Sequence, residues 1–173
     1  MTIPQYHLCH LNIGPANAPL SAPEMSGFVE NLERINELAY SSPGFVWHLK
    51  IDINNPADLA LYGVPGLLFN LSVWESVEAL KEYTYKGAHA QMMQRRREWF
   101  GSMNTPNYVL WWIPAGSLPT LEEAKLRLAH RETYGPSLVG FDFKHPFEPG
   151  YITLGTVGST NHDGSALSPA SQG

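Results

Sequence analysis

Hydrophobic and polar residues alternate along four segments of the chain, and apolar residues recur every three or four positions along several others. Alternation is typical of half-buried strands, whereas the longer period is typical of amphipathic helices. The predicted strands are residues 5–13, 45–51, 67–74 and 108–113. Helices are expected in the segments that have an apolar face or begin with a capping residue. These segments are residues 25–39, 76–83, 85–100 and 120–134.

Capping residues mark where three of these helices begin. Ser21 and Glu24 have the spacing of a capping box before the first helix. Ser76 is the expected N-cap of the second. Thr120 and Glu123 form another capping box before the last helix.

The order strand–helix–strand–strand–helix–strand predicts an α+β fold with a ferredoxin-like, four-stranded antiparallel sheet and helices on one face. Both faces of the predicted strands are largely apolar. Val46, Leu68 and Trp74, for example, lie on the second face of their strands, opposite the face that carries the other apolar side chains. Because helices are expected to cover only one face, the other needs a second sheet. The sequence therefore predicts a homodimer through the sheet faces, closed into a dimeric α+β barrel.

The chain of 173 residues is long enough for one domain with a sizeable core, which we place at residues 1–145. Residues 146–173 are expected to be a flexible C-terminal tail. Gly, Pro and Ser accumulate after Gly135, and residues 155–173 have too few apolar side chains to offset the entropy cost of ordering.

Charge and composition restrict the classes of partner. The net charge is −5, and the basic cluster Arg95–Arg97 is the only one in the sequence, which argues against nucleic acid. No stretch is apolar enough to suggest a membrane span, and the first residues do not resemble a signal peptide. A single cysteine, Cys9, excludes an intrachain disulfide. A cytoplasmic location is expected.

The predicted helix at residues 85–100 carries two polar side chains on its apolar face. It either follows after Lys86 and Gly87 or runs on from the preceding helix. Helical spacing places seven residues on this stripe: Tyr85, His89, Met92, Met93, Arg96, Trp99 and Phe100. Imidazole groups transfer protons near neutral pH, and a partly buried guanidinium can hold an anion. We therefore regard His89 as a candidate acid/base and Arg96 as a candidate anion holder. The alternative is that both are core residues whose polar groups are satisfied by neighbours.

Polar side chains on the strands form a second candidate group. They are His10 and Asn12, His48 and Lys50, and Asn70 and Ser72. His48 is a further catalytic candidate, and Asn70 and Ser72 could donate hydrogen bonds to a carbonyl or hydroxyl ligand. The alternative is a set of hydrogen-bonded polar groups inside a barrel, because the sequence leaves open which strand face meets the helices.

Aromatic side chains are abundant and could clamp a flat ligand. The candidates are Trp47, Trp74, Tyr83, Tyr85, Trp99, Trp111 and Trp112. Core packing is the alternative for most of them. Tyr83 and Tyr85 are favoured as site residues, because their hydroxyl groups require hydrogen-bond partners.

No cofactor or metal is predicted. His7 and His10 would point to opposite faces of a strand, and no cluster of His and carboxylates has ligand spacing. Haem binding through His89 has no supporting motif. No glycine-rich loop opens a helix after a strand, so a nucleotide is not expected.

Four segments resemble the domain-of-unknown-function 3291 (DUF3291) family. They are SPGFVW at residues 42–47, NLSVWESVEAL at 70–80, RRREWF at 95–100 and VLWWIPAG at 109–116. The resemblance covers roughly residues 5–143. It implies the dimeric α+β barrel superfamily, which includes cofactor-free monooxygenases, polyketide cyclases, stress-response proteins and haem-associated enzymes. Residues 55–58 with the segment after them, and the chain beyond about residue 145, depart from the family pattern.

These observations favour a cofactor-independent enzyme acting on an aromatic or polyketide-like small molecule. Acid/base chemistry by His89, with Arg96 as anion holder, would perform cyclisation, isomerisation or dehydration. Two alternatives remain open at this stage. One is cofactor-free monooxygenation of an electron-rich phenol, and the other is a non-catalytic ligand-binding or stress protein.

Overall fold

A four-stranded antiparallel sheet forms the centre of the computed structural model, which describes residues 5–154. The strands are β1 (Tyr6–Pro15), β2 (Phe45–His48), β3 (Leu67–Trp74) and β4 (Tyr108–Pro114). Their order across the sheet is β2-β3-β1-β4, with β1 and β3 at the centre. The predicted α+β fold with a ferredoxin-like sheet is therefore confirmed.

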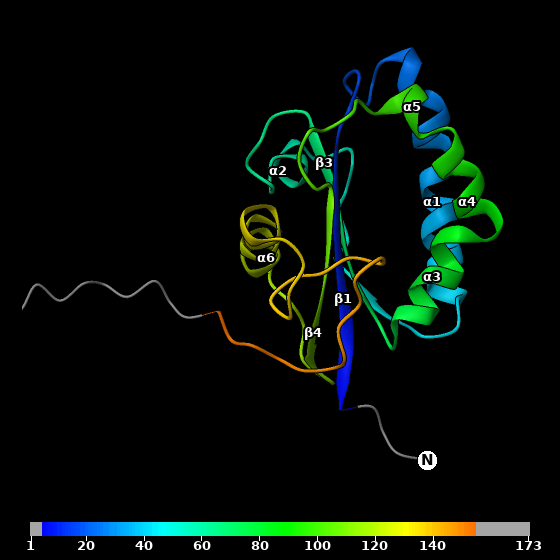
Figure 1. The fold of residues 1–173 in the computed structure, drawn as a ribbon. Helices are drawn as coiled ribbons and strands as arrows, with labels where there is room; N and C mark the ends of the chain where they lie inside the picture. The colour runs from blue at the N-terminus through cyan, green and yellow to red at the C-terminus, as the bar shows by residue number, and fades with distance from the viewer. Residues whose placement is uncertain (1–4, 155–173) are drawn as a thin grey trace, which may run out of the picture.

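One face of the sheet lies opposite a layer of helices (Figure 1). This layer contains α1 (Ser26–Ser41), α3 (Val77–Tyr85), α4 (Gly87–Gln94) and α5 (Arg96–Trp99). The helix predicted at residues 85–100 is thus divided. The chain leaves helical geometry at Lys86, where φ is −124° and ψ is 155°, and Gly87 has a φ of +65°, which favours glycine. A second, smaller break lies at Arg95, where ψ is 0°.

Two of the three predicted caps are confirmed. The hydroxyl oxygen of Ser76 accepts a hydrogen bond from the Ala79 amide, and that of Thr120 accepts one from the Glu123 amide. The capping box at Ser21 is wrong: a short 3-10 turn, η1 (Pro23–Met25), precedes α1, and its N-cap is Ala22 without a side-chain bond. Pro23 starts this turn, because its fixed φ suits a first helical position.

The second strand differs from its predicted pattern. A β-bulge between Phe45 and Trp47 shifts the register, so that Phe45 lies opposite Trp74, Trp47 opposite Val73 and His48 opposite Ser72. The extra residue changes which side chains share a face. The predicted loop that follows contains a short helix, α2 (Pro56–Leu59).

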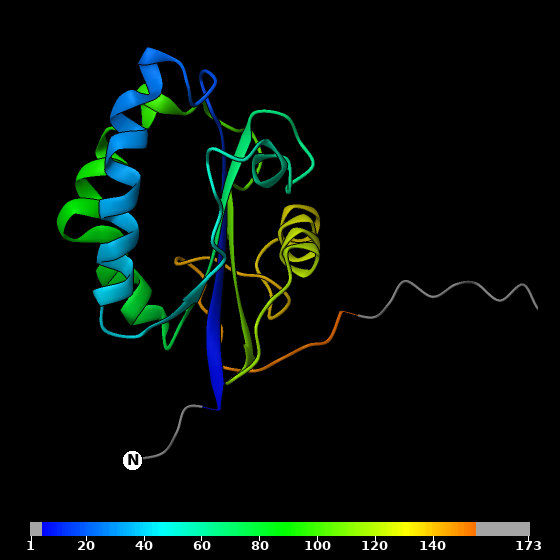
Figure 2. The same ribbon diagram turned by 180° about the vertical axis from the view of Figure 1, so that it is seen from behind.

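The last helix, α6 (Leu121–Tyr134), lies on the other side of the sheet from α1 and α4 (Figure 2). Ala124 and Leu128 of α6 belong to a buried cluster with Leu11, Val109 and Trp111. The expectation of helices on one face only is therefore corrected. The apolar residues of the second face are covered within the same chain, so the reason given for a dimer through the sheet faces does not hold.

Residues after α6 continue along the edge strand β4. Phe141 and Leu110 exchange two backbone hydrogen bonds of 2.8 and 2.9 Å. The indole of Trp112 donates to the Phe147 carbonyl at 2.9 Å, and Arg127 donates to the Ile152 carbonyl at 2.7 Å. These contacts extend past the predicted domain boundary at residue 145. The part of the predicted tail at residues 155–173 lies outside the described residues.

Candidate functional site

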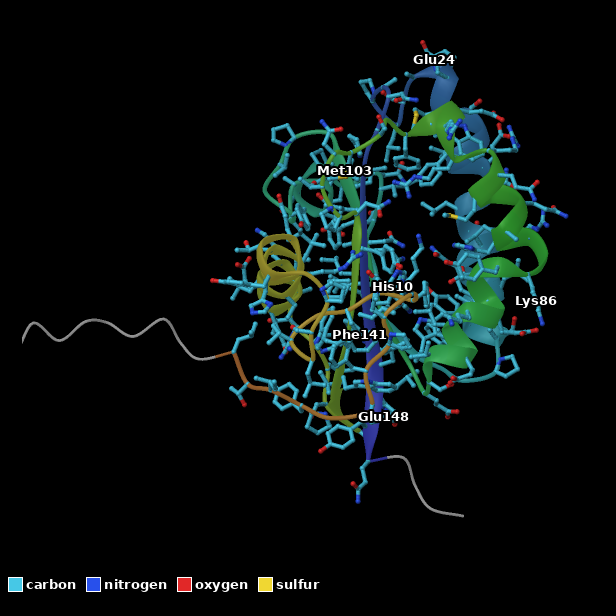
Figure 3. All side chains as sticks on the ribbon, in the orientation of Figure 1. His10, Glu24, Lys86, Met103, Phe141 and Glu148 are labelled. Atoms are coloured by element: carbon cyan, nitrogen blue, oxygen red, sulfur yellow. The ribbon has the colours of Figure 1, made fainter. Side chains whose placement is uncertain are left out.

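A cavity of about 200 Å³ lies between the sheet and the helix layer. Its sheet wall comes from β1, β2 and β3, and its helix wall comes from α1, α3, α4 and α5. Figure 3 labels His10 of β1, whose side chain belongs to the sheet wall. Most of the remaining lining is apolar, from residues such as Leu32, Leu68 and Phe100.

His89 contributes an imidazole from the helix wall. Its Nδ1 lies 3.0 Å from the Thr84 carbonyl oxygen, which can only accept, so Nδ1 carries a proton in this geometry. The other nitrogen, Nε2, is then free to accept a proton when the ring is neutral. Burial lowers the pKa of His89, and the Thr84 hydrogen bond partly opposes this. The neutral, basic form is therefore favoured near pH 7.

Arg96 is the one charged side chain among the described residues that line the cavity. Its Nη2 donates a long hydrogen bond of 3.4 Å to the Ile13 carbonyl, and its guanidinium lies 5.6 Å from the centre of the Phe100 ring. Within residues 5–154 no carboxylate forms an ion pair with it. Burial lowers its pKa, which reflects the cost of holding this cation without a partner. An anionic ligand group would remove that cost.

The sheet wall presents a row of polar side chains. His10 lies opposite Ser72 and Asn12 opposite Asn70 in the β1–β3 ladder, while His48 lies opposite Ser72 in the β2–β3 ladder. The hydroxyl oxygen of Ser72 accepts a 3.0 Å hydrogen bond from the Trp74 indole, so its own proton remains available. Neither asparagine carboxamide forms a hydrogen bond within the part of the chain that the structure describes.

His10 is the most enclosed polar group of this row. It is 8% exposed, and its ring makes no hydrogen bond to any residue from 5 to 154. Burial, with a smaller contribution from the nearby His89, lowers its pKa from 6.5 to about 3. His10 is therefore neutral at pH 7, and its ring can donate one hydrogen bond and accept another.

Aromatic rings close the end of the cavity near His89. The rings of Trp74 and Tyr83 are stacked at 5.0 Å, and Tyr83 lies 4.6 Å from the His89 ring. The Tyr83 hydroxyl donates to the Ile35 carbonyl of α1 at 3.2 Å. Burial raises the pKa of Tyr83, so this hydroxyl keeps its proton. Tyr83 is thus held as a wall of the cavity.

The structure brings eight of the eleven predicted site residues to this cavity: His48, Asn70, Ser72, Trp74, Tyr83, His89, Arg96 and Trp99. Tyr85, Trp47 and Trp112 do not line it. Tyr85 is 60% exposed and packs on Phe143. The bulge in β2 directs Trp47 to the cluster on the α6 side, and Trp112 lies near the β4 edge, against Phe141.

Several cavity residues were not among the predicted site residues. Asn36 of α1 lines the cavity and has no hydrogen-bond partner in the described chain. Asn36 could have been identified in the sequence, because its spacing of four residues from the apolar Leu32 places both side chains on one face of a helix. Asn12 and His10 belong to the polar strand positions, but only the tertiary structure shows that these positions face the helices.

Within residues 5–154, no group of three or more His, Cys, Asp or Glu could hold a metal ion. None of the helices in that range has the length and apolar character required to cross a membrane.

The fold and the site define an α+β protein with a largely apolar cavity between its sheet and its helices. The chain belongs to the family called Domain of unknown function (DUF3291), whose model matches residues 7–153. The resemblance found in the sequence is therefore confirmed. A comparison with curated proteins gives no match.

Solved structures with a similar fold include two named as oxygenases. SnoaB, a cofactor-independent oxygenase from Streptomyces nogalater, has 16% identity and a TM-score of 0.44, over 66% of this chain and 98% of that one. A proposed antibiotic biosynthesis monooxygenase from Nitrosomonas europaea has 8% identity and a TM-score of 0.45, over 69% of this chain and 98% of that one. At these identities the likeness concerns the fold alone.

Proposed function

We propose that this protein is a cofactor-independent enzyme that moves protons on an aromatic or polyketide-like substrate held in the cavity. The observation that carries the proposal is the cation Arg96, which has no carboxylate partner in the described chain and shares an apolar cavity with the three imidazoles of His10, His48 and His89. An uncompensated cation favours a ligand that is, or becomes, an anion. Phenolates and the enolates of aromatic ketones are anions of this kind, and their aromatic rings suit the apolar walls of the cavity.

In the proposed reaction, Nε2 of His89 accepts a proton from an acidic C–H or O–H group of the substrate. The negative charge that develops is stabilised by Arg96, and a low-polarity cavity strengthens this interaction. On the opposite wall, His10 and the carboxamide of Asn70 orient the carbonyl oxygen. Return of the proton from His89 to a different carbon completes an isomerisation. If the enolate carbon instead attacks a second carbonyl carbon of the substrate, the new alkoxide takes the proton and the product is cyclised. If the proton goes to a β-hydroxyl group, the C–O bond breaks, water leaves and the product is dehydrated.

The same arrangement supports one alternative reaction. A bound phenolate is electron-rich, and it could itself reduce oxygen without a cofactor. Proton removal by His89 and charge stabilisation by Arg96 are then the first steps, as in the leading proposal. A non-catalytic ligand-binding protein is the third possibility, for which only the cavity and Arg96 are needed.

Anthrone provides one probe for all three functions, because it is an aromatic ketone with an acidic methylene group. In D₂O without oxygen, we expect the wild-type protein to accelerate deuterium exchange at this methylene, as measured by NMR. In air, oxidation of anthrone by O₂ to anthraquinone and water would instead favour the oxygenase. Binding of anthrone with neither exchange nor oxidation above the buffer rate would favour the non-catalytic protein.

Substitutions connect the activity to the named residues. His89→Gln is expected to reduce the exchange rate about a hundredfold, the usual contribution of a general base. Arg96→Met is expected to weaken binding, because the enolate loses its counter-charge. Arg97→Met is the matched control, since Arg97 is exposed and does not line the cavity. Full activity of the His89→Gln variant with an intact fold would contradict the proposed role.

A homodimer remains part of the proposal, on a different ground from the sequence argument. Leu126 and Tyr134 are 56% and 74% exposed on α6, and their spacing of eight residues places them on one face of the helix. We expect sedimentation velocity at tens of micromolar to give twice the chain mass. Leu126→Glu should shift the protein toward monomer, and a wild-type monomer at these concentrations would overturn the dimer.

A further inference from the structure

A second chamber of about 80 Å³ adjoins the main cavity on the side of β2. Its outer wall comes from residues 49–59, which include α2. Both chambers are lined by Phe28, Leu32 and Asn36, which are four residues apart and so form one stripe of α1. His48 and Asn70 of the sheet also line both. The two chambers therefore share one wall formed by α1 and another formed by the sheet.

The far side of the second chamber is apolar. Ile51, Ile53 and Leu59 contribute aliphatic side chains to it. Asp58 is the one acidic residue among its described lining residues, but its carboxylate is already engaged. One oxygen accepts from the Asp52 amide at 2.8 Å, and the other accepts from the Asn55 carboxamide at 3.1 Å. The chamber thus offers no free charge to a ligand.

Polar groups are concentrated where the two chambers meet. Asn36 on the α1 wall and Asn70 on the sheet wall have no hydrogen-bond partner in residues 5–154. His48 has one, because its Nδ1 lies 3.1 Å from the Tyr40 hydroxyl. A ligand that passes through this junction could receive hydrogen bonds from either carboxamide. The junction is therefore suited to a polar linking atom, and the space beyond it to an apolar group.

We propose that the second chamber binds an apolar extension, a ring or a short alkyl group, of the same ligand whose anionic aromatic part occupies the main cavity. The substrate class is accordingly an elongated aromatic anion rather than a single compact ring system. Leu59 and Ile53 become specificity-determining residues under this proposal. It rests on the proposed function, because the aromatic anion must first bind beside Arg96.

Two commercially available probes separate the chambers. 1-Naphthalenesulfonate has only the anionic aromatic part, whereas 8-anilino-1-naphthalenesulfonate adds an anilino ring. We expect the wild-type protein to bind the larger probe roughly tenfold more tightly, as measured by titration calorimetry, since an extra buried ring of this size stabilises a complex by at least that factor. Filling the second chamber should remove this preference and leave the smaller probe unaffected.

The chamber is filled by Leu59→Trp and, independently, by Ile53→Trp. In each variant we expect the ratio of the two affinities to fall below about threefold, with the affinity for 1-naphthalenesulfonate within about twofold of wild type, less than 0.5 kcal/mol. Leu61→Trp is the matched control, because it adds the same side chain to an exposed position outside both chambers. Melting temperatures establish that each variant is folded.

The outcomes are distinguishable. An unchanged affinity ratio in both folded variants would overturn the second chamber as a subsite and leave the proposed function intact. Equal losses for both probes would also overturn it, because the substitutions would then act on the main cavity. If neither probe binds the wild-type protein, the proposed function fails, and this inference fails with it.

Discussion

The guanidinium of Arg96 lies directly against the backbone of Gly14 near the end of β1. A Cβ atom at Gly14 would be 3.0 Å from Nη2 of Arg96 and 3.0 Å from the Phe100 ring. Real Cβ atoms rarely have contacts this short, so a side chain at position 14 would have to displace the cation or the ring. Gly14 therefore sets the position of the one charged group that lines the cavity in the described chain.

Gly14→Ala is expected to weaken the binding of 1-naphthalenesulfonate severalfold, because Arg96 must move while its charge is retained. Gly101→Ala is the matched control, since a Cβ atom there would meet nothing closer than 3.5 Å. Calorimetric titration of both variants measures the effect. Wild-type affinity in a folded Gly14→Ala variant would mean that the location of Arg96 does not matter for the anion.

The lowered pKa of His10 predicts a loss of stability in mild acid. The unfolded chain protonates this histidine below pH 6.5, whereas the folded protein does so only near pH 3. The unfolded state therefore binds more protons in this window, and stability falls as the pH decreases through it, by up to about 1.4 kcal/mol per pH unit. Above pH 6.5 the contribution is complete.

His10→Gln is expected to make the stability less dependent on pH between 6.5 and 5, as measured by urea denaturation. His48 and His89 keep their contributions, because burial lowers the pKa of each as well. Measurements at pH 8 give the cost of the substitution itself, outside the window. Identical slopes for the variant and the wild type would show that His10 is already protonated in the folded protein.

Arg127 joins α6 to the segment that follows it, and its loss should be costly. The side chain is fully buried and donates to Glu123, to the Val139 carbonyl and to the Ile152 carbonyl. Arg127→Met leaves these acceptors unpaired, so we expect a loss of about 3–5 kcal/mol in chemical denaturation. Lys86→Met, which breaks an exposed pair with Glu82, is expected to cost less than about 1 kcal/mol. Similar losses would contradict the anchoring role.

Two truncations test where the domain ends. Deleting residues 155–173 is expected to change the melting temperature by only about one or two degrees, judged from the composition of that segment. Deleting residues 147–173 also removes the carbonyls that pair with Trp112 and Arg127. Each buried donor left unpaired costs about 1–3 kcal/mol, so this truncation should be clearly destabilised. If the two truncated proteins were equally stable, the domain boundary would lie at residue 145, as the sequence predicts.

Local patterns in the sequence were sufficient for the sheet and for part of the helix layer. Strand alternation and strand order are local or sequential properties, and they predicted a ferredoxin-like sheet that the structure confirms. Ser76 and Thr120 cap their helices through neighbouring amides, which are fixed by a spacing of three residues. His89 and Arg96 were found because a polar side chain on an apolar helix face is visible in the spacing alone.

The bulge in β2 was not visible in these patterns, whereas the break at Lys86 and Gly87 was one of two alternatives that they left open. A bulge inserts one residue and reverses the faces on either side of it. Trp47 therefore packs toward α6, although periodicity grouped it with Phe45, which lines the cavity. Nothing in the sequence of this strand distinguishes a regular ladder from a bulged one, because the difference lies in its pairing with β3.

The sequence by itself determined which residues form strands, which helices are amphipathic and that polar groups interrupt one apolar face. Only the tertiary structure decided that His10, Asn12, Asn70 and Ser72 face the helices, and that α6 covers the opposite face of the sheet. The physical reason is that a strand presents two faces with equal local preference. Which face meets which helix depends on the path of the chain after each strand, and that path is selected by burial over the whole domain.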